Sequence, residues 1–341
     1  MRRICLIIAA LFTMVACSEK GKQFSVTSLY KKTIYSGDTI SFEITSKKNI
    51  VPDSVVIMVD GQSFSYINTT RCVLPTDNLQ MGEKTLSIYT YRKGKKEVNL
   101  RSMRILSDLV PAQLKYEVVA TYNHDKQSYT QGLQYENGYF YESAGLYDES
   151  SLRYVDAKSG KVLRKQMLDS VYFAEGITLV GDSLFQLTWR EQTGFIYNKR
   201  TFEQIGSFSY PTEGWGMCYN GTHLIVSDGS EYLYFYDPKT MALHHKIAVY
   251  DNLGAVSRLN ELEFVQGFVY ANIYTTDKIV KINPSNGKVA AEIDFTNLLP
   301  QQQSEDVDVL NGIAWNPTND HFYVTGKLWP RLYEVRLYFQ K

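Results

Sequence analysis

The chain has 341 residues, of which 36 are Lys or Arg and 36 are Asp or Glu, so its formal net charge is zero. This balance argues against a nucleic-acid-binding protein, which would carry a basic face. The 26 tyrosines, 16 phenylalanines and many short apolar runs between glycines are typical of an all-β protein, and the length allows two domains.

The first residues are predicted to be a targeting segment. Two arginines precede an apolar run over residues 4–16, which has the length of a secretion signal and is too short to span a bilayer. The run ends in MVAC, which resembles the lipobox of bacterial lipoproteins. We therefore expect residues 1–16 to be a lipoprotein signal peptide, Cys17 to be lipidated and residues 17–23 to be a tether. Plain secretion or an uncleaved anchor is the alternative.

This segment also predicts the location of the protein. A lipid on Cys17 would hold it at a membrane of the bacterial cell envelope, in the periplasm or at the outer-membrane surface. The membrane is then a partner through the lipid anchor alone.

Residues 24–107 are predicted to form a small immunoglobulin-like β-sandwich. Segments such as SFEIT, VVIMV and LSIYTY have short, alternating or apolar strand patterns, and turns such as SGD, VDGQ and RKGKK separate them. This part of the sequence has no cluster of acids, histidines or cysteines, so we expect a spacer or docking role. Residues 108–115 are expected to be the linker to the next domain.

From residue 116 onward the sequence contains a five-fold internal repeat. Its first element is QGL at 131, EGI at 175, WGM at 215, NEL at 260 and NGI at 311, at steps of 44, 40, 45 and 51 residues. Each copy continues with an apolar strand and then with a strand–turn–strand pattern. Four short strands in roughly 45 residues are the size of one propeller blade, so residues 116–341 are predicted to form a five-bladed β-propeller.

The last copy of the repeat lacks its fourth strand. It stops after RLYEVRL, whereas YEVVATYNH at residues 116–124 precedes the first copy and can provide the missing strand. We expect the two ends of this domain to pair, because pairing would close the ring and remove an exposed sheet edge.

Equivalent positions of a propeller repeat face one central axis. The first position of the first element defines a first ring, and the residue that ends the second element defines a second ring. The side chains differ from copy to copy, which a purely structural position would not require. We predict that the two rings meet at one channel mouth, with Glu175 as its acid and Trp189 beside it. The first ring is Gln131, Glu175, Trp215, Asn260 and Asn311, and the second is Gly145, Trp189, Gly229, Tyr274 and Lys327.

Structural roles stay open for several of these residues. Trp215 between two glycines would also suit packing between blades, and Lys327 would suit an exposed position. Asn260 and Asn311 would suit hydrogen bonds to loop backbone, which is the commonest use of asparagine in turns.

Metal and cofactor chemistry has little support in the sequence. The loop with Glu305, Asp306 and Asp308 has oxygen ligands that suit a calcium ion, or it is a solvated loop. The five histidines lack the spacing of zinc ligands, and we find no nucleophile motif and no phosphate-binding loop. We therefore expect no metal and no other cofactor.

Ten motifs in order between residues 117 and 338 closely resemble the plant and bacterial glutamine cyclotransferases. They are YTQGL, GLYDESSLR, YFAEGIT, QLTW, GWGM, SDGS, RLNELE, YANIY, DVLNGIAW and VTGKLWPRLYEV. Members of this family are five-bladed propeller enzymes, unrelated to the zinc-dependent animal type. They convert the N-terminal glutamine of a peptide to pyroglutamate and release ammonia.

The resemblance implies roles for individual residues. Glu175 is similar to the family's acid/base glutamate, and Lys327 to the lysine of TGK, which would stabilise an oxyanion or tune Glu175. These two are the expected catalytic residues. The family often has Trp where this chain has Tyr274, so the pocket is expected to differ in size or affinity. The expected substrate-binding residues are Tyr129, Gln131, Phe173, Trp189, Trp215, Asn260 and Tyr274.

The sequence thus predicts a metal-independent glutaminyl-peptide cyclotransferase, an acyltransferase of the aminoacyl type, that acts as a monomer on peptides with N-terminal glutamine. One alternative is a propeller that binds peptides or glycans without catalysis. A second is a metal-dependent lactonase-type propeller, which would need several channel carboxylates around a cation, whereas this channel is predicted to hold one glutamate among amides.

Overall fold

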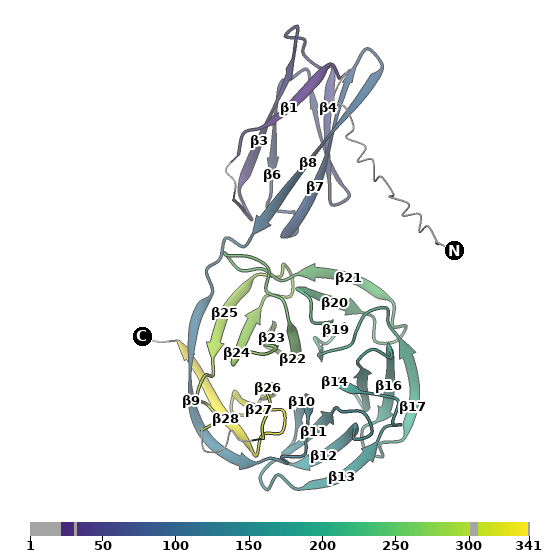
Figure 1. Cartoon of the computed structure of the whole chain (residues 1–341), viewed down its shortest axis with the longest axis vertical. Helices are drawn as coiled ribbons and strands as arrows, with labels where there is room; N and C mark the ends of the chain where they lie inside the picture. The colour runs from purple at the N-terminus through teal and green to yellow at the C-terminus, as the bar shows by residue number, and fades with distance from the viewer. Residues whose placement is uncertain (1–21, 31–32, 301–305, 340–341) are drawn as a thin grey trace, which may run out of the picture. The chain divides into compact units, whose positions relative to one another are not determined.

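The computed structural model describes residues 22–30, 33–300 and 306–339. Every helix or strand assigned within these ranges is a β-strand, so the all-β prediction is confirmed (Figure 1). Over the same ranges, no helix has the length and apolar character needed to cross a membrane. The predicted signal peptide, Cys17 and Glu305 lie outside the described residues.

The chain divides into two compact units. The first comprises Met1–Tyr30, Thr39–Leu74 and Thr85–Ser102, as far as these residues are described. The second comprises Lys31–Asp38, Pro75–Lys84 and Met103–Lys341, with the same restriction. The division is discontinuous within residues 24–107, which the sequence predicted as one domain.

The first eight described strands form two sheets, and alternate residues are buried along strands such as β3 and β7. The three-stranded sheet contains β1 (Phe24–Ser28), β3 (Thr39–Ser46) and β6 (Arg71–Pro75). The five-stranded sheet has the order β2 (Ile34–Tyr35), β8 (Lys95–Leu106), β7 (Gly82–Arg92), β4 (Ser54–Val59) and β5 (Gln62–Ile67).

Three antiparallel four-stranded sheets of the described chain follow the predicted repeat, each with its strands in sequence order. The first contains β10 (Thr130–Glu136), β11 (Tyr139–Ala144), β12 (Ser151–Asp156) and β13 (Val162–Met167). The second contains β14 (Ala174–Val180), β15 (Ser183–Thr188), β16 (Thr193–Asn198) and β17 (Gln204–Ser209). The third contains β18 (Met217–Tyr219), β19 (Leu224–Ser227), β20 (Tyr232–Tyr236) and β21 (Leu243–Ala248).

The last two copies of the repeat belong to one eight-stranded sheet. One half contains β22 (Leu259–Val265), β23 (Phe268–Ile273), β24 (Lys278–Ile282) and β25 (Val289–Asp294). The other contains β26 (Leu310–Asn316), β27 (His321–Gly326), β28 (Arg331–Phe339) and β9 (Ala112–Asn123). The halves join where the first residues of β9, Ala112–Leu114, pair in parallel with Ala291–Ile293 of β25.

The expected pairing of the two ends of this domain is confirmed. β9 runs antiparallel to β28, from Leu114 opposite Phe339 to Asn123 opposite Arg331, and so provides the fourth strand of the last copy. β9 starts at Ala112, inside the segment predicted as linker, because its first residues already pair with β25.

In Figure 1 the sheets of the second unit lie around a common centre, with β10, β14, β22 and β26 innermost. Apolar side chains fill the space between neighbouring sheets. Among the described residues, one cluster packs Leu152 of β12 against Ile177 of β14, and the next packs Leu187 of β15 against Met217 of β18. Similar clusters join each following pair, including the first and last copies of the repeat. This packing holds the innermost strands side by side.

Each of the four long inner strands is interrupted at the position of the first ring. The register with the second strand shifts between Thr130 and Gly132 in β10 and between Ala174 and Ile177 in β14. It shifts at the equivalent place in β22 and β26. Such bulges leave residues out of the ladder and redirect their side chains, so the first-ring residues of these four strands point to the centre of the second unit.

Glycine in the second position of the repeat allows the inner strands to approach one another. A Cβ atom on Gly176 would lie 2.6 Å from the backbone nitrogen of Met217. One on Gly216 would lie 1.9 Å from the carbonyl oxygen of Asn260. The repeated QGL, EGI and WGM patterns therefore reflect close backbone contact between adjacent sheets.

Candidate active site

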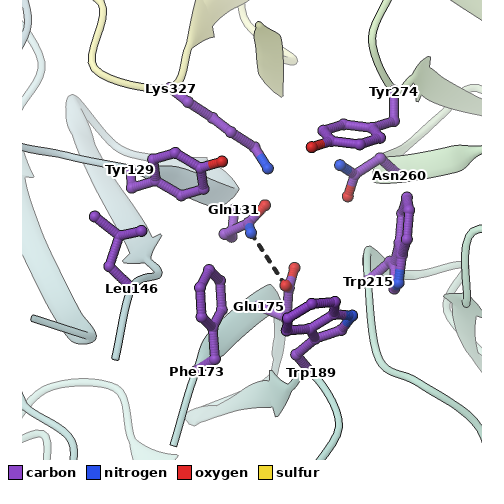
Figure 2. Close-up of a pocket in the computed structure, with 10 residues that line it drawn as sticks. All are labelled: Tyr129, Gln131, Leu146, Phe173, Glu175, Trp189, Trp215, Asn260, Tyr274 and Lys327. Atoms are coloured by element: carbon purple, nitrogen blue, oxygen red, sulfur yellow. Dashed lines mark hydrogen bonds between the residues drawn. The ribbon is translucent and has the colours of Figure 1, made fainter. Parts of the chain in front are cut away.

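The bulged inner strands surround a cavity of about 210 Å³. All nine residues that the sequence selected for the propeller site line it, and the structure adds Leu146 (Figure 2). The lining residues are Tyr129, Gln131, Leu146, Phe173, Glu175, Trp189, Trp215, Asn260, Tyr274 and Lys327. Segments almost 200 residues apart thus meet at one place.

Glu175 lies at the bulge of β14 and only 4 % of its surface is exposed. Burial raises the pKa of its carboxyl well above the usual value, and the carboxylates of Glu213 and Glu191 add to this, while the Lys327 ammonium opposes it. A carboxyl group with a raised pKa exchanges protons readily near neutral pH.

Gln131 is held between Glu175 and Asn311. Its Nε2 donates to Oε1 of Glu175 at 3.0 Å, and its Oε1 accepts from Nδ2 of Asn311 at 3.2 Å. Asn311 Nδ2 also donates to the backbone carbonyl of Thr130 at 2.9 Å. Asn311 is therefore the first-ring residue that does not line the cavity, and it has the backbone-bonding role that the sequence left open.

Asn260 is 2 % exposed and lines the cavity. Its Oδ1 is buried without a hydrogen-bond partner among the described residues. A buried acceptor without a donor costs free energy, so this atom is suited to accept a hydrogen bond from a ligand N–H.

Lys327 follows β27 and is 3 % exposed, so it is not the surface lysine that the sequence left open. Its Nζ lies 4.6 Å from the centre of the Tyr129 ring and 5.0 Å from that of Tyr274. Burial lowers the pKa of Lys327, and the carboxylates of Glu175 and Asp308 oppose this shift. The ammonium therefore faces aromatic rings and a nearby acid rather than water.

The aromatic walls occupy space that two second-ring glycines leave free. A Cβ on Gly145 would lie 2.4 Å from the Phe173 ring, and one on Gly229 would lie 2.6 Å from the Trp215 indole. Phe173 contacts Trp189 edge to face, with ring centres 5.6 Å apart. Gly229 of the second ring thus leaves room for Trp215 of the first ring, and Gly145 leaves room for Phe173, which explains why these positions differ from copy to copy.

Two acids fix these aromatic residues: Glu213, which the sequence missed, and Asp308, which it considered only as a calcium ligand. Glu213 accepts hydrogen bonds from the indole nitrogens of both Trp189, at 2.8 Å, and Trp215, at 3.1 Å. Asp308 accepts from the Tyr129 hydroxyl at 2.8 Å. Glu213 lies two residues before Trp215, outside the repeated elements, so the alignment of repeats gave no signal for it.

Glu175 is the one acid among the described residues that line the cavity, as predicted, but an innermost strand carries two further buried acids. Glu261 and Glu263 of β22 are also buried, and burial raises the pKa of both, for Glu263 to about 8. Glu261 accepts from the backbone N–H groups of Leu133, at 3.1 Å, and Ile313, at 2.8 Å. In the NEL copy Glu261 stands where QGL, EGI and WGM have glycine, and its carboxyl group bridges three inner strands.

These acids do not form a metal centre within the described residues, where no group of three or more His, Cys, Asp or Glu side chains is arranged to hold a metal ion. Asp308, which the sequence considered as a calcium ligand, bonds Tyr129 and the backbone nitrogen of Val309 at 2.7 Å.

Comparison with known proteins supports the resemblance seen in the motifs. The sequence model of the glutamine cyclotransferase family matches residues 95–337. The chain is 42 % identical over 226 residues to the glutaminyl-peptide cyclotransferase of Arabidopsis thaliana, which covers 65 % of this chain and 71 % of the relative. The crystal structure of Myxococcus xanthus glutaminyl cyclase matches with a TM-score of 0.64 and 35 % identity, over 68 % of this chain and all of the other.

Proposed function

The chain belongs to the glutamine cyclotransferase family, and from this premise we propose how its pocket performs the reaction. The protein is a glutaminyl-peptide cyclotransferase, an acyltransferase that converts the N-terminal glutamine of peptides to pyroglutamate. The observation that carries the mechanism is the buried carboxyl of Glu175, which lies among aromatic rings and amides.

Binding comes first. The cavity of about 210 Å³ admits one side chain rather than several residues. The glutamine side chain enters between Phe173, Trp189 and Trp215, which exclude water from it. The Oδ1 of Asn260 accepts an N–H of the substrate, which satisfies an acceptor that is buried without a partner among the described residues. The rest of the peptide stays outside.

Glu175 then prepares the nucleophile. The α-amine of a peptide has a pKa near ~8 and is mostly an ammonium at neutral pH. The Glu175 carboxylate, whose own pKa is raised well above the usual value, accepts one proton from it. The neutral nitrogen attacks the side-chain amide carbon, forming the C–N bond of a five-membered ring, and the carbonyl becomes an oxyanion. Both partners are tethered, so the walls of the pocket only need to fix the productive rotamer.

Collapse of this intermediate requires a proton on the leaving nitrogen. Glu175 gives its proton to that nitrogen and takes one from the ring nitrogen, after which the C–N bond breaks and ammonia leaves as the carbonyl reforms. The proton left on Glu175 passes to ammonia or to solvent. Lys327 lies beside this site and stabilises the negative charge of the intermediate or of Glu175. None of these steps uses a metal ion.

The test is a mass-spectrometric assay of a Gln-initiated peptide, which loses one ammonia on cyclisation, with and without chelator. Glu175→Gln should fold and lose on the order of 10²–10⁴-fold in turnover, because the amide cannot shuttle a proton. Near-normal turnover of this variant would exclude the shuttle. A chelator-sensitive wild type would exclude the metal-independent route, and an intact peptide would favour the binding protein without catalysis.

We also propose the finer architecture and the location. Five antiparallel four-stranded groups in the described second unit support a five-bladed propeller over residues 116–341. The two sheets formed by β1–β8 support an immunoglobulin-like sandwich over residues 24–107. The lipobox-like MVAC supports a lipid anchor on Cys17 and a place in the cell envelope. The pairing of β9 with β28 removes an exposed sheet edge and so supports a monomer. Cys17→Ala should release the protein from the membrane fraction.

A further inference from the structure

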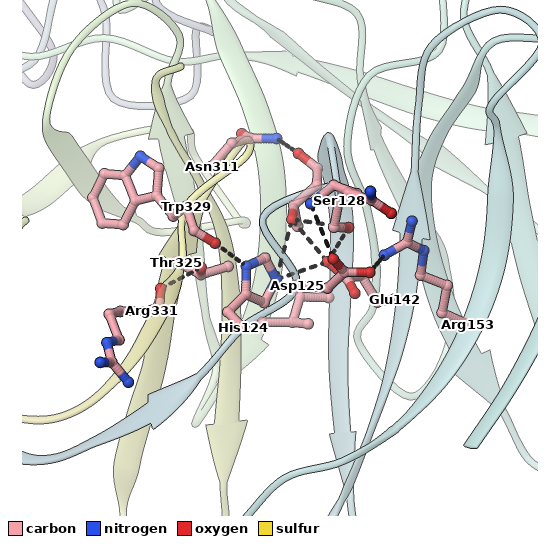
Figure 3. Close-up of polar contacts among 12 residues, drawn as sticks. His124, Asp125, Ser128, Glu142, Arg153, Asn311, Thr325, Trp329 and Arg331 are labelled. Atoms are coloured by element: carbon pink, nitrogen blue, oxygen red, sulfur yellow. Dashed lines mark hydrogen bonds and ion pairs between the residues drawn. The ribbon is translucent and has the colours of Figure 1, made fainter. Parts of the chain in front are cut away.

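Behind the wall of the cavity lies a buried charged pair. His124 follows β9 and Glu142 lies on β11, and their side chains are 5 % and 2 % exposed (Figure 3). The Nε2 of His124 is 2.9 Å from Oε1 of Glu142, and its Nδ1 is 2.7 Å from the carbonyl oxygen of Trp329. Both oxygens can only accept hydrogen bonds, so both ring nitrogens donate and the imidazole carries a positive charge.

The charges around His124 support this protonation. Burial lowers the pKa of His124 and the Arg153 guanidinium also lowers it, but Glu142 and the Trp329 carbonyl outweigh them and the pKa is raised. The pKa of Glu142 falls to about 2 despite burial, because His124, Arg153 and Ser128 stabilise its carboxylate. Arg153 itself donates to Asp125 at 3.0 Å.

Glu142 fixes the segment that carries two cavity residues. Its Oε1 also accepts from the hydroxyl groups of Ser128, at 2.5 Å, and Thr130, at 2.8 Å. These residues lie on either side of Tyr129, and Thr130 directly precedes Gln131. The charged pair therefore sets the position of the chain from which Tyr129 and Gln131 enter the cavity.

His124 fixes a segment near the C-terminal end of the domain, which carries Lys327. The carbonyl that its Nδ1 contacts belongs to Trp329, two residues after Lys327. A backbone hydrogen bond also joins the Lys327 segment to the Gln131 segment, since the nitrogen of Leu328 donates to the carbonyl of Ser128 at 2.7 Å. The pair thus connects the Gln131 segment with the Lys327 segment.

A hydrogen-bond path leads from this pair to Glu175. Asn311 bonds both the carbonyl of Thr130 and the side chain of Gln131, so a shift of Thr130 changes the orientation of the Gln131 amide. Gln131 in turn donates to Glu175 at 3.0 Å. The path ends on the proposed acid/base rather than on the aromatic walls, so its loss should affect proton transfer more than binding.

We propose that His124 and Glu142 are positioning residues, which act through Thr130 and Asn311 to hold Gln131, and through Trp329 to hold Lys327, in the geometry that Glu175 requires. This inference rests on the proposed function of Glu175. It assigns the pair a role in turnover beyond stabilising the junction between the first and last sheets of the repeat.

The test uses Thr130, because removing His124 or Glu142 would leave an unpaired buried charge and threaten folding. Thr130→Val keeps the shape of the side chain and removes its hydrogen bond to Glu142, together with the longer contacts of 3.5 Å to Ser128 Oγ and His124 Nε2. We expect kcat for ammonia release to fall about 10-fold or more, with KM changed less than about 3-fold, because small displacements of positioning groups cost rate. Thr130→Ser keeps the hydroxyl and should restore kcat to within about 3-fold.

Thr325→Val is the matched control. Thr325 is also fully buried at this junction, but its hydroxyl donates to the Arg331 carbonyl at 2.9 Å. Both valine variants should lose similar thermal stability, measured by circular dichroism, whereas only Thr130→Val should lose turnover. Unchanged kcat in folded Thr130→Val, or an equal loss in Thr325→Val, would overturn the inference alone. A wild type that releases no ammonia would overturn the proposed function and the inference with it.

Discussion

Glu175 and Lys327 are two ionisable side chains that the cavity buries, and each affects the protonation of the other. Burial raises the pKa of the acid and lowers that of the base, while their mutual attraction opposes both shifts. The raised pKa of the acid makes its carboxylate a better acceptor for the proton of the substrate amine, and the lysine limits this rise. The sequence left two roles open for Lys327, stabilising an oxyanion or tuning Glu175, and these roles make different predictions.

Lys327→Met separates the two roles. If the ammonium tunes Glu175, its removal raises the pKa of that carboxyl further. The acidic limb of the pH profile of kcat/KM, which reports the free enzyme, should then move to higher pH. Lys281→Met is the control, since Lys281 also faces aromatic rings but lies outside the cavity lining. A profile that keeps its acidic limb while the rate falls would assign Lys327 to the oxyanion.

At the scale of strands, the bulge explains how a repeat of four-stranded units forms a site. In an unbroken strand the side chains would alternate between the two faces of the sheet, and that of Glu175 would point to one of these faces. Because the register shifts between Ala174 and Ile177, Glu175 leaves the ladder at the end nearest the centre. The adjacent Gly176 is equally necessary, since it lets the next sheet approach.

Gly176→Ala tests this close approach. Its Cβ would lie 2.6 Å from the backbone nitrogen of Met217, which cannot move without shifting the sheet. We expect the free energy of unfolding in urea to fall by about 1–3 kcal/mol. Gly206→Ala in β17, where the nearest atom is a flexible Ile196 methyl at 3.5 Å, should change it far less. Equal effects of the two changes would contradict the role of Gly176.

How much the sequence could predict follows from these elements. The repeat aligned Gln131, Glu175 and Asn260 because they occupy the same bulge position of their inner strands, and Trp215 because it holds the equivalent place just before β18. Glu213 escaped because it lies two residues before Trp215, outside the aligned elements; at the same offset in the first two copies, Tyr129 and Phe173 were found only through the family resemblance. Glu261 escaped for another reason: its side chain reaches two strands from other sheets, and contacts of this kind depend on how the sheets pack.

For the molecule as a whole, the buried acids of β22 connect stability to pH. Glu261 bonds the backbones of β10 and β26, and Glu263 bonds the Trp315 nitrogen, at 3.2 Å, and the Gln134 side chain. Both lie at the centre of the sheets and hold a proton over a wide pH range. The folded protein therefore binds more protons than the unfolded chain across much of the neutral range.

Glu263→Gln measures this effect. In the folded protein Glu263 keeps its proton until about pH 8, whereas an unperturbed carboxyl loses it near 4.5. Its contribution to stability is complete below about pH 4.5 and is lost as the pH rises through about 8, with a slope of at most ~1.4 kcal/mol per pH unit. The variant should flatten the fall of unfolding free energy between pH 5 and 8.

The exposed Glu203→Gln serves as the reference for this measurement, since it removes one carboxyl without removing a buried group. Glu261 continues to act in both variants, so the slope should decrease in Glu263→Gln and not vanish. Parallel curves for Glu263→Gln and wild type would show that Glu263 titrates normally in the folded state.

The pairing of β9 with β28 also sets an order of assembly. Glu175 is present once the second sheet of the repeat has formed, but Lys327 follows β27, and β28 must still find a strand made more than 200 residues earlier. In a growing chain that has folded only its first sheets, Glu175 would lie in an incomplete cavity that is open to solvent. Turnover should therefore begin as a single late event, when the first and last strands of the domain meet.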